Sequence, residues 1–185
     1  MKFCGASRRQ DGKSVNDDAF ACLGNYAFLM DGAGACGGRA QRLMEIVKRQ
    51  GNQAHLQQLV TLLNFHAISL GLESTLLAVH IQDEVLTGVS IGNNTVHLLR
   101  DGRLTRLNET TRRRLGRPNP DVHYFSAALK RYDCVVLCSD GVVLDAYRFS
   151  QILQRYLLRP TEMPEAVLAA QKDHSDDATV VCRSI

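Results

Sequence analysis

A series of short β-type segments in the middle of the chain constrains the fold more than any other feature. The segments cover residues 75–81, 85–91, 95–99 and 104–107. Turn-forming residues separate them at positions 82–84, 92–94 and 101–102, and the last of these turns, Asp101-Gly102, is a strong hairpin signal. Because hairpin turns join neighbouring strands, the sequence predicts antiparallel sheets rather than a parallel, doubly wound sheet.

Further strands and helices are predicted on both sides of this region. β-type segments cover residues 2–8, 18–23, 26–31, 121–129, 134–139 and 178–183, and apolar residues at helical spacing cover 39–50, 53–70, 149–158 and 163–172. Gly24-Asn25 predicts a hairpin, Gly51-Asn52 a break between the first two helices, and Gly71 a helix cap. Helical pairs between groups of strands indicate an α+β fold, a four-layer α-β-β-α sandwich with two mainly antiparallel sheets flanked by helices.

Length and composition narrow the class of protein. A chain of 185 residues, 45% hydrophobic and 22% charged, is typical of one globular domain, which we assign to residues 1–185. A net charge of +3 is too small for a dedicated nucleic-acid binder. No apolar run is long enough for a membrane span or a secretory signal, so we expect a cytoplasmic protein without a membrane partner. The six cysteines form no CxxC pair, and we expect them to be reduced and mostly buried.

Four aspartates, each at the edge of a predicted strand, are the main candidates for chemistry. They are Asp18, Asp31, Asp140 and Asp176. In two of them an apolar strand runs directly into Asp-Gly, at positions 31–32 and 140–141. A glycine there lets the backbone turn sharply, and its carbonyl can lie beside the carboxylate as another oxygen ligand.

Several carboxylates brought together repel one another unless cations neutralise them. Oxygen ligands without an accompanying His or Cys set favour Mg²⁺ or Mn²⁺ over zinc. A pair of such ions suits the transfer of a phosphoryl group to water. The alternative is a structural β domain in which each Asp-Gly is only a turn, as we interpret Asp101-Gly102. Two strand–Asp–Gly motifs and two paired aspartates in one small chain favour the metal site.

With these aspartate motifs the chain resembles a known family, the metal-dependent protein phosphatases of type 2C (PPM). The resemblance is to the short bacterial branch of the stage II sporulation phosphatase E and stress-response phosphatases. It runs nearly end to end and in family order, through five segments. They are residues 12–20, 30–40, 89–102, 136–142 and 175–181, which include Asn-Asp-Asp-Ala-Phe, Met-Asp-Gly-Ala-Gly, Ser-Ile-Gly-Asn-Asn, Cys-Ser-Asp-Gly-Val and Ser-Asp-Asp-Ala-Thr.

The resemblance implies a role for each aspartate. It implies that Asp31 bridges two Mn²⁺ or Mg²⁺ ions and that the Gly32 carbonyl holds one of them, while Asp140 and Asp176 complete the other site. Asp18, with Asp17 as a further candidate, binds metal directly or through water. A metal-activated water then attacks phosphorus in line. Asp177 lies outside the implied ligand set.

Three departures from the family pattern matter. Lys13 stands where larger relatives carry a phosphate-binding arginine, and a lysine offers a point charge without the bidentate fork. Arg8 and Arg9 are candidates to assist Lys13. The alternative is that they are only solvated side chains at the end of a strand. Asn93 replaces the aspartate that serves a third ion, so we expect that ion to bind weakly or not at all.

The third departure is that the segment between residues 107 and 122 is too short for the usual flap subdomain, which we expect to be missing or minimal. Four arginines remain in it, at positions 112, 113, 114 and 117. Their positive charge could attract an acidic or phosphorylated partner. The alternative is that they are simply a solvated run of charges on the surface.

The resemblance therefore predicts a protein serine/threonine phosphatase, a phosphoric monoester hydrolase with a dinuclear Mn/Mg centre that acts in bacterial signalling. Its partners would be a phosphorylated protein substrate and a cognate Ser/Thr kinase. Lys13 and Asn93 motivate an alternative from another class, a pseudophosphatase that keeps the fold and serves as a protein-binding regulatory module.

Overall fold

The computed structural model describes residues 1–32, 37–50 and 55–185, and within them the strands form two five-stranded antiparallel sheets. One sheet has the order β1-β10-β9-β6-β7 and the other β2-β3-β4-β5-β8. Their bounds are Cys4–Arg8 (β1), Asp18–Leu23 (β2), Tyr26–Asp31 (β3), Leu76–Gln82 (β4), Val85–Ile91 (β5), Thr95–Arg100 (β6), Arg103–Arg106 (β7), His123–Ala128 (β8), Cys134–Cys138 (β9) and Ala178–Ser184 (β10).

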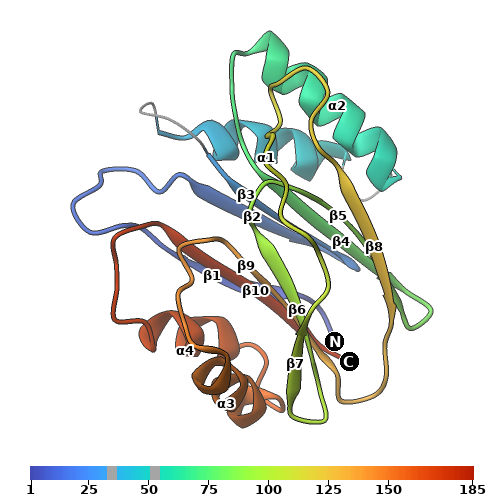
Figure 1. Cartoon of the computed structure of the whole chain (residues 1–185), viewed down its shortest axis with the longest axis vertical. Coiled ribbons are helices and arrows are strands. Elements are labelled where there is room, and N and C mark those ends of the chain that lie inside the picture. Colours follow the sequence, from blue (N-terminus) through green and yellow to red (C-terminus); the bar gives the residue numbers. More distant parts are fainter. Residues whose placement is uncertain (33–36, 51–54) are drawn as a thin grey trace.

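Two pairs of helices cover the outer faces of the sheets, so the molecule has four layers (Figure 1). Helices α1 (Arg39–Gln50) and α2 (Leu56–Ser69) lie over the sheet that contains β3, and α3 (Ala146–Tyr156) and α4 (Met163–Ala169) lie over the sheet that contains β10. The predicted α-β-β-α sandwich is therefore confirmed.

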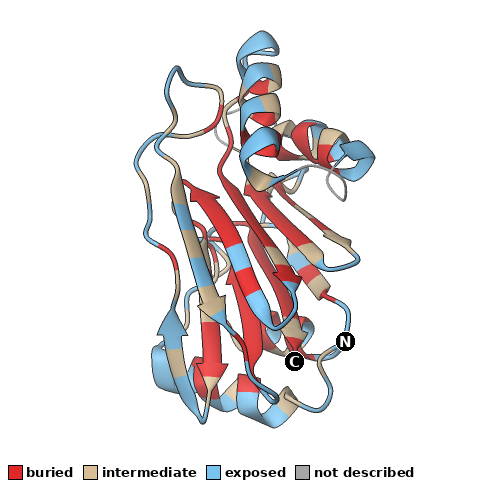
Figure 2. Ribbon diagram, turned by 90° about the vertical axis from the view of Figure 1, so that its right-hand side faces the viewer, coloured by how far each residue is buried: buried red, intermediate tan, exposed pale blue. Residues whose placement is uncertain are grey.

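Three layers of apolar side chains hold the sandwich together, and the buried residues follow the strands through its middle (Figure 2). One layer lies between α1, α2 and their sheet, one between the two sheets, and one between the other sheet and α3, α4. Phe28, Leu29 and Val136 represent these three layers in turn, and each is 0% exposed. The alternation of inward and outward side chains along β3 explains why Phe28 and Leu29 enter different layers.

Most predicted elements are found within a few residues of their expected bounds, because turns and apolar periodicity define them locally. Gly71, with φ of 61°, ends α2 as predicted: the Leu72 and Gly71 amides donate to the carbonyls of Ala67 and Ile68. The third helix begins earlier than predicted, at Ala146, since the side chain of Asp145 caps it. Gly51-Asn52 and the first two residues of the predicted second helix lie outside the described residues.

One residue departs from the predicted apolar spacing of α2. By that spacing Ile68 belongs with Leu63 on the apolar face, but Ile68 is 48% exposed, whereas Leu63 is fully buried. Ala67 takes the core position in the last turn instead.

The five cysteines within the described residues are free, and Cys134, Cys138 and Cys182 are buried, as expected; Cys36 lies outside the described residues. Among the described residues no helix is long and apolar enough to cross a membrane. The segment between β7 and β8 contains, in the described structure, a single isolated β-bridge and no helix, so the predicted loss of the flap is confirmed.

The difference in burial between Leu63 and Ile68 should appear as a difference in the stability of their alanine variants. Leu63→Ala should lower the free energy of unfolding by about 2–5 kcal/mol because it leaves a cavity in a close-packed layer. Ile68→Ala should change it by about 0.5 kcal/mol or less, since much of that side chain is already in water. Urea denaturation of both variants tests the assignment, and equal losses would contradict it.

Candidate metal centre

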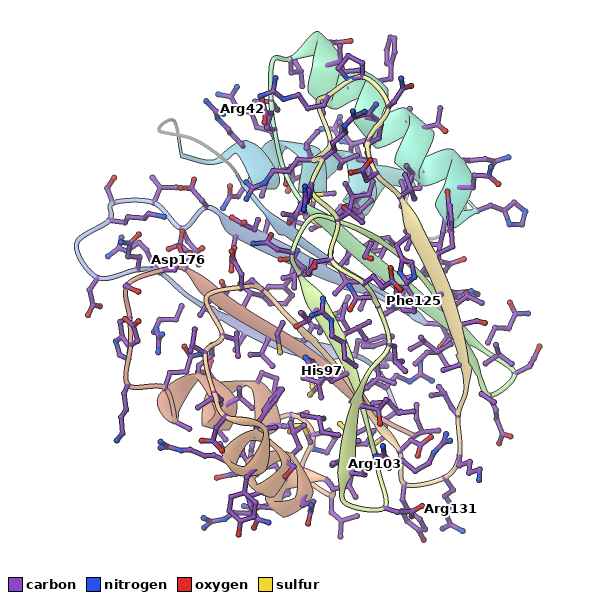
Figure 3. All side chains as sticks on the ribbon, viewed as in Figure 1. Arg42, His97, Arg103, Phe125, Arg131 and Asp176 are labelled. Atoms are coloured by element: carbon purple, nitrogen blue, oxygen red, sulfur yellow. The ribbon has the colours of Figure 1, made fainter. Side chains whose placement is uncertain are left out.

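The four predicted aspartates lie at the same end of the two sheets. Asp18 begins β2 and Asp31 ends β3, and the two are directly opposed in the register of this antiparallel pair. Asp140 follows β9 and Asp176 precedes β10, and these strands are neighbours in the other sheet. Asp176 lies at the end of the sandwich opposite Arg103 and Arg131 (Figure 3).

Asp18 is held in place from the opposite sheet and from helix α1. Its carboxylate is 5% exposed and accepts a hydrogen bond of 2.7 Å from the Ser139 hydroxyl, which itself accepts one of 2.9 Å from the Thr179 amide. The Gln41 side chain on α1 donates to the Asp18 carbonyl at 2.9 Å and to the Asn16 carbonyl. Ser139, which directly follows β9, and Gln41 on α1 therefore hold the first aspartate motif in place.

Asp31 is fixed through its backbone. Its amide donates to the Thr75 hydroxyl at 2.8 Å, and its carbonyl accepts from the Ser74 hydroxyl and the Thr75 amide, each at 2.9 Å. This leaves the carboxylate to face the cluster, where the Arg114 guanidinium lies 3.9 Å from one of its oxygens.

Burial and mutual repulsion disfavour ionisation of the two opposed carboxylates. Burial raises the pKa of Asp18 to about 7, and the charges of Asp177 and Asp140 act in the same direction against the hydrogen bond from Ser139. Burial also raises the pKa of Asp31 to about 7, assisted by Asp18 and Asp140. The cluster is thus a site of concentrated negative potential at neutral pH.

The glycines of the two Asp-Gly motifs also allow neighbouring loops to pack closely, and a turn does pass through Asp140-Gly141, where the Val142 amide donates to the Ser139 carbonyl at 3.1 Å. Neither Gly32 nor Gly141 has a positive φ. A Cβ on Gly141 would lie 1.9 Å from the Asp177 carbonyl oxygen, and one on Gly32 would lie 3.1 Å from the Asp17 carbonyl oxygen. Each glycine therefore allows another aspartate-bearing loop to approach its own aspartate.

Asp177 and Lys13 connect the two ends of the chain at this site. Asp177 is 2% exposed and accepts hydrogen bonds from the Gln10 and Asp17 amides at 2.6 and 2.7 Å and from the Lys13 ammonium at 3.0 Å. Burial alone would raise the pKa of Asp177, but these donors outweigh it and lower the pKa. Conversely, burial opposes the charge on Lys13, and Asp177, Asp17 and Asp176 raise its pKa.

The remaining two aspartates are exposed and hydrogen-bonded to their neighbours. Asp140 accepts from the Asn93 side chain, and Asp176 accepts from the Asp177 amide at 2.8 Å and lies 3.9 Å from Lys13. Within the described residues no three His, Cys, Asp or Glu side chains come close enough together to hold a metal ion. The donor set still fits a hard divalent cation, because buried and opposed carboxylates with raised pKa values supply oxygen ligands and need positive charge.

Of three other predicted residues, Asp17 lies beside Lys13, and Arg8 and Arg9 are engaged elsewhere. One Asp17 oxygen accepts from the Gly38 amide at 3.0 Å, and the other lies 3.5 Å from Lys13. The Arg8 guanidinium donates to the Leu168 carbonyl at 3.0 Å, and that of Arg9 to the Ser14 carbonyl at 2.9 Å. Lys13 and the four aspartates thus lie at one end of the sandwich, whereas Arg8 and Arg9 donate to backbone carbonyls and Arg8 also donates to the Gln171 side chain at 3.2 Å.

Sequence reasoning missed the residues that orient the carboxylates. Ser139 lies inside a recognised motif, one position before Asp140, and that adjacency was the available signal. Gln41 sits in an ordinary helix and Arg114 in a run of arginines, and nothing in the local pattern separates either from its surface neighbours.

Comparisons with known proteins agree with this geometry. A family model described as Stage II sporulation protein E (SpoIIE) matches residues 32–185. Comparison with curated proteins gave no match. Among solved structures, the serine/threonine phosphatase of S. agalactiae superposes with a TM-score of 0.85 at 15% identity, covering 97% of each chain.

Two further structures carry metal ions. The catalytic domain of the serine/threonine phosphatase PstP in complex with two manganese ions has a TM-score of 0.81 at 20% identity, covering 98% of this chain and 97% of its own. RsbX in complex with magnesium has a TM-score of 0.77 at 15% identity, covering 98% of this chain and 94% of its own. At these identities the likeness establishes a shared fold, that of the PPM phosphatases.

Protons and Mn²⁺ compete for the same carboxylates, so the stabilisation of the fold by Mn²⁺ should depend on pH. Because the folded pKa values of Asp18 and Asp31 exceed their usual value, the folded chain without added metal binds extra protons and should lose stability as the pH rises from about 4 to 7. Mn²⁺ at about 100 times its Kd adds about 2.7 kcal/mol. The Tm should therefore rise by about 5–10 °C at about pH 8 and by less than half of that at about pH 5.5. Thermal unfolding with and without Mn²⁺ measures this, and equal shifts at both pH values would contradict it.

The close approach at Gly141 gives a second prediction. Gly141→Ala should lower the free energy of unfolding by at least about 2 kcal/mol and also abolish the Mn²⁺-induced rise in Tm, because the Asp177 loop must move away. Gly24→Ala is the control: it strains a hairpin with φ of 62° and costs about 1–2 kcal/mol, but its Cβ meets nothing within 4 Å. Thermal unfolding should show that this control keeps the Mn²⁺ response. A normal Mn²⁺ response in Gly141→Ala would show that the two loops need not touch.

Proposed function

Because the chain belongs to the stage II sporulation protein E (SpoIIE) family, we propose that it is a metal-dependent phosphatase that hydrolyses phosphoserine or phosphothreonine in a protein substrate. The observation that carries this proposal is the pair of opposed carboxylates, Asp18 and Asp31, with pKa values raised to about 7 by burial and by other aspartates. Such a cluster is costly for folding alone and favourable for binding cations.

The proposed ligand set is drawn from both sheets. Asp31 would bridge two Mn²⁺ or Mg²⁺ ions, Asp140 and Asp176 would hold one of them, and Asp18 would bind directly or through water, with the Gly32 carbonyl as a further oxygen ligand. When bound, two such ions supply a water that is nucleophilic at neutral pH and neutralise the phosphate charge. A bound cation would also replace the hydrogen bond that Asn93 donates to Asp140.

The protein itself would orient these ligands and bind the phosphate. Ser139 and Gln41 fix Asp18, and the Thr75 hydroxyl and amide fix Asp31, so the chain holds both carboxylates before substrate arrives. Lys13 carries a positive charge 3.9 Å from Asp176 and is itself held by Asp177. We assign it the role of attracting a phosphate oxygen, as a point charge rather than a bidentate fork.

The substrate class follows from the shape of the site. Asp140 and Asp176 are exposed, so a phosphate on a protein surface could reach them without entering a deep cavity. A phosphoprotein that a cognate Ser/Thr kinase modifies in bacterial signalling fits this open site, and we propose such a protein as the partner.

Hydrolysis of p-nitrophenyl phosphate tests the activity without a known protein substrate. Wild-type protein should hydrolyse it only with Mn²⁺ or Mg²⁺, and Asp31→Asn should lower kcat/KM at least about 100-fold, since it removes the bridging charge. Asp101→Asn is the matched control: it makes the same change in a hairpin turn whose φ of 50° asparagine tolerates.

The control variant should retain the wild-type rate. Equal rates for the wild type and Asp31→Asn, with or without added metal, would overturn the proposal. That result would favour a pseudophosphatase that uses the same fold to bind a partner.

A further inference from the structure

A cavity of about 560 Å³ lies beside the aspartate cluster and is strongly basic. It is lined by Glu73, Arg112, Arg113, Arg114, Arg117 and Pro118. Arg114 belongs to both places, because its guanidinium also lies 3.9 Å from the Asp31 carboxylate. The cavity and the proposed reaction centre are therefore adjoining parts of one surface.

The loop that carries these arginines is anchored to the core. Leu115 is 0% exposed, and its amide and carbonyl pair with Ser74 in a β-bridge, while Ser74 in turn bridges to Gly32. Gly116, with φ of 89°, donates to the Asn64 side chain at 2.9 Å, and a Cβ there would lie 1.8 Å from the Leu72 carbonyl oxygen. The arginines thus stand on a fixed piece of backbone that is tied to the end of β3.

The arginines carry more charge than their neighbours neutralise. Arg117 pairs with Glu73 at 2.7 Å, which satisfies the one acidic residue of the cavity lining. The Arg113 guanidinium donates to the Asn119 carbonyl at 3.3 Å, and its backbone amide donates to the Asp121 carboxylate at 3.3 Å, but among the described residues the guanidinium forms no ion pair. Arg112 is exposed, and in the part of the chain that the structure describes it forms no ion pair. The cavity therefore presents unneutralised guanidinium groups next to an anionic centre, an arrangement that has no evident role in stability.

We infer that this arginine cavity binds acidic side chains that flank the phosphorylated residue of the substrate. Guanidinium forks match carboxylates in geometry and charge. A peptide advances about 3.5 Å per residue, so side chains within about three residues of a phosphoserine at the aspartate cluster can reach the cavity. The inference rests on the proposed phosphatase function and adds to it a preference among substrates.

Two phosphoserine peptides test the inference, one with glutamates within three residues on both sides and one with glutamines in their place. The wild type with Mn²⁺ should show a kcat/KM about 3–10 times higher for the glutamate peptide, and this ratio should fall as salt is added. Arg112→Gln/Arg113→Gln should bring the ratio close to 1 and leave hydrolysis of p-nitrophenyl phosphate unchanged. Both side chains are exposed, so the fold should tolerate the change.

The matched control is Arg103→Gln/Arg131→Gln, which removes two exposed arginines at the opposite end of the sandwich (Figure 3). It should keep the wild-type ratio. As a second variant, Arg112→Glu/Arg113→Glu should invert the preference toward a lysine-flanked peptide.

Different results would contradict the arginine cavity and the phosphatase function. A wild type that hydrolyses p-nitrophenyl phosphate but treats both peptides equally would overturn the arginine cavity and leave the phosphatase. The same holds if the control lowers the peptide ratio as much as the cavity variant does. A wild type that hydrolyses nothing with Mn²⁺ would overturn the phosphatase itself.

Discussion

Asp18 and Asp31 oppose each other across β2 and β3, and much of the structure around this end of the sandwich serves to hold these two carboxylates together. Bringing like charges into a partly buried site raises both pKa values to about 7, which is a cost that folding must meet elsewhere. The three apolar layers supply that stability, and the hydrogen bonds from Ser139 and Thr75 direct where the charges lie. A cation is the natural partner of such a cluster, and this links the fold to its proposed chemistry.

The two-sheet architecture is what allows four distant segments to meet. Each sheet contributes two aspartate-bearing strand ends, and the segments approach so closely that Gly141 has no room for a side chain and Gly32 has room for one only at a tight contact. Asp177 and Lys13 then join the N-terminal loop to the start of β10. The described part of the site is therefore closely packed in its backbone and concentrated in charge, a combination that suits preorganised catalysis. The arginine loop extends the same scaffold outward through the bridge from Leu115 to Ser74.

The fold was largely predictable from the sequence, because hairpin turns and apolar spacing are local signals, and β2, β3 and β5 begin and end where they predict. The four aspartates were predictable as a set, since each sits at a strand boundary. Their supporting contacts were not: Gln41 and Ser139 act through the tertiary arrangement of segments far apart in sequence. The same holds for Arg8, whose partners on α4 and beyond it are about 160 residues away along the chain.

Anomalous diffraction from crystals grown with Mn²⁺ tests most directly whether these carboxylates form the proposed dinuclear metal centre. We expect two anomalous peaks within about 4 Å of each other, with Asp31 between them and oxygens of Asp18, Asp140 and Asp176 as further ligands or partners of bound water. No peak at the cluster, or a single ion bound away from Asp31, would contradict the account.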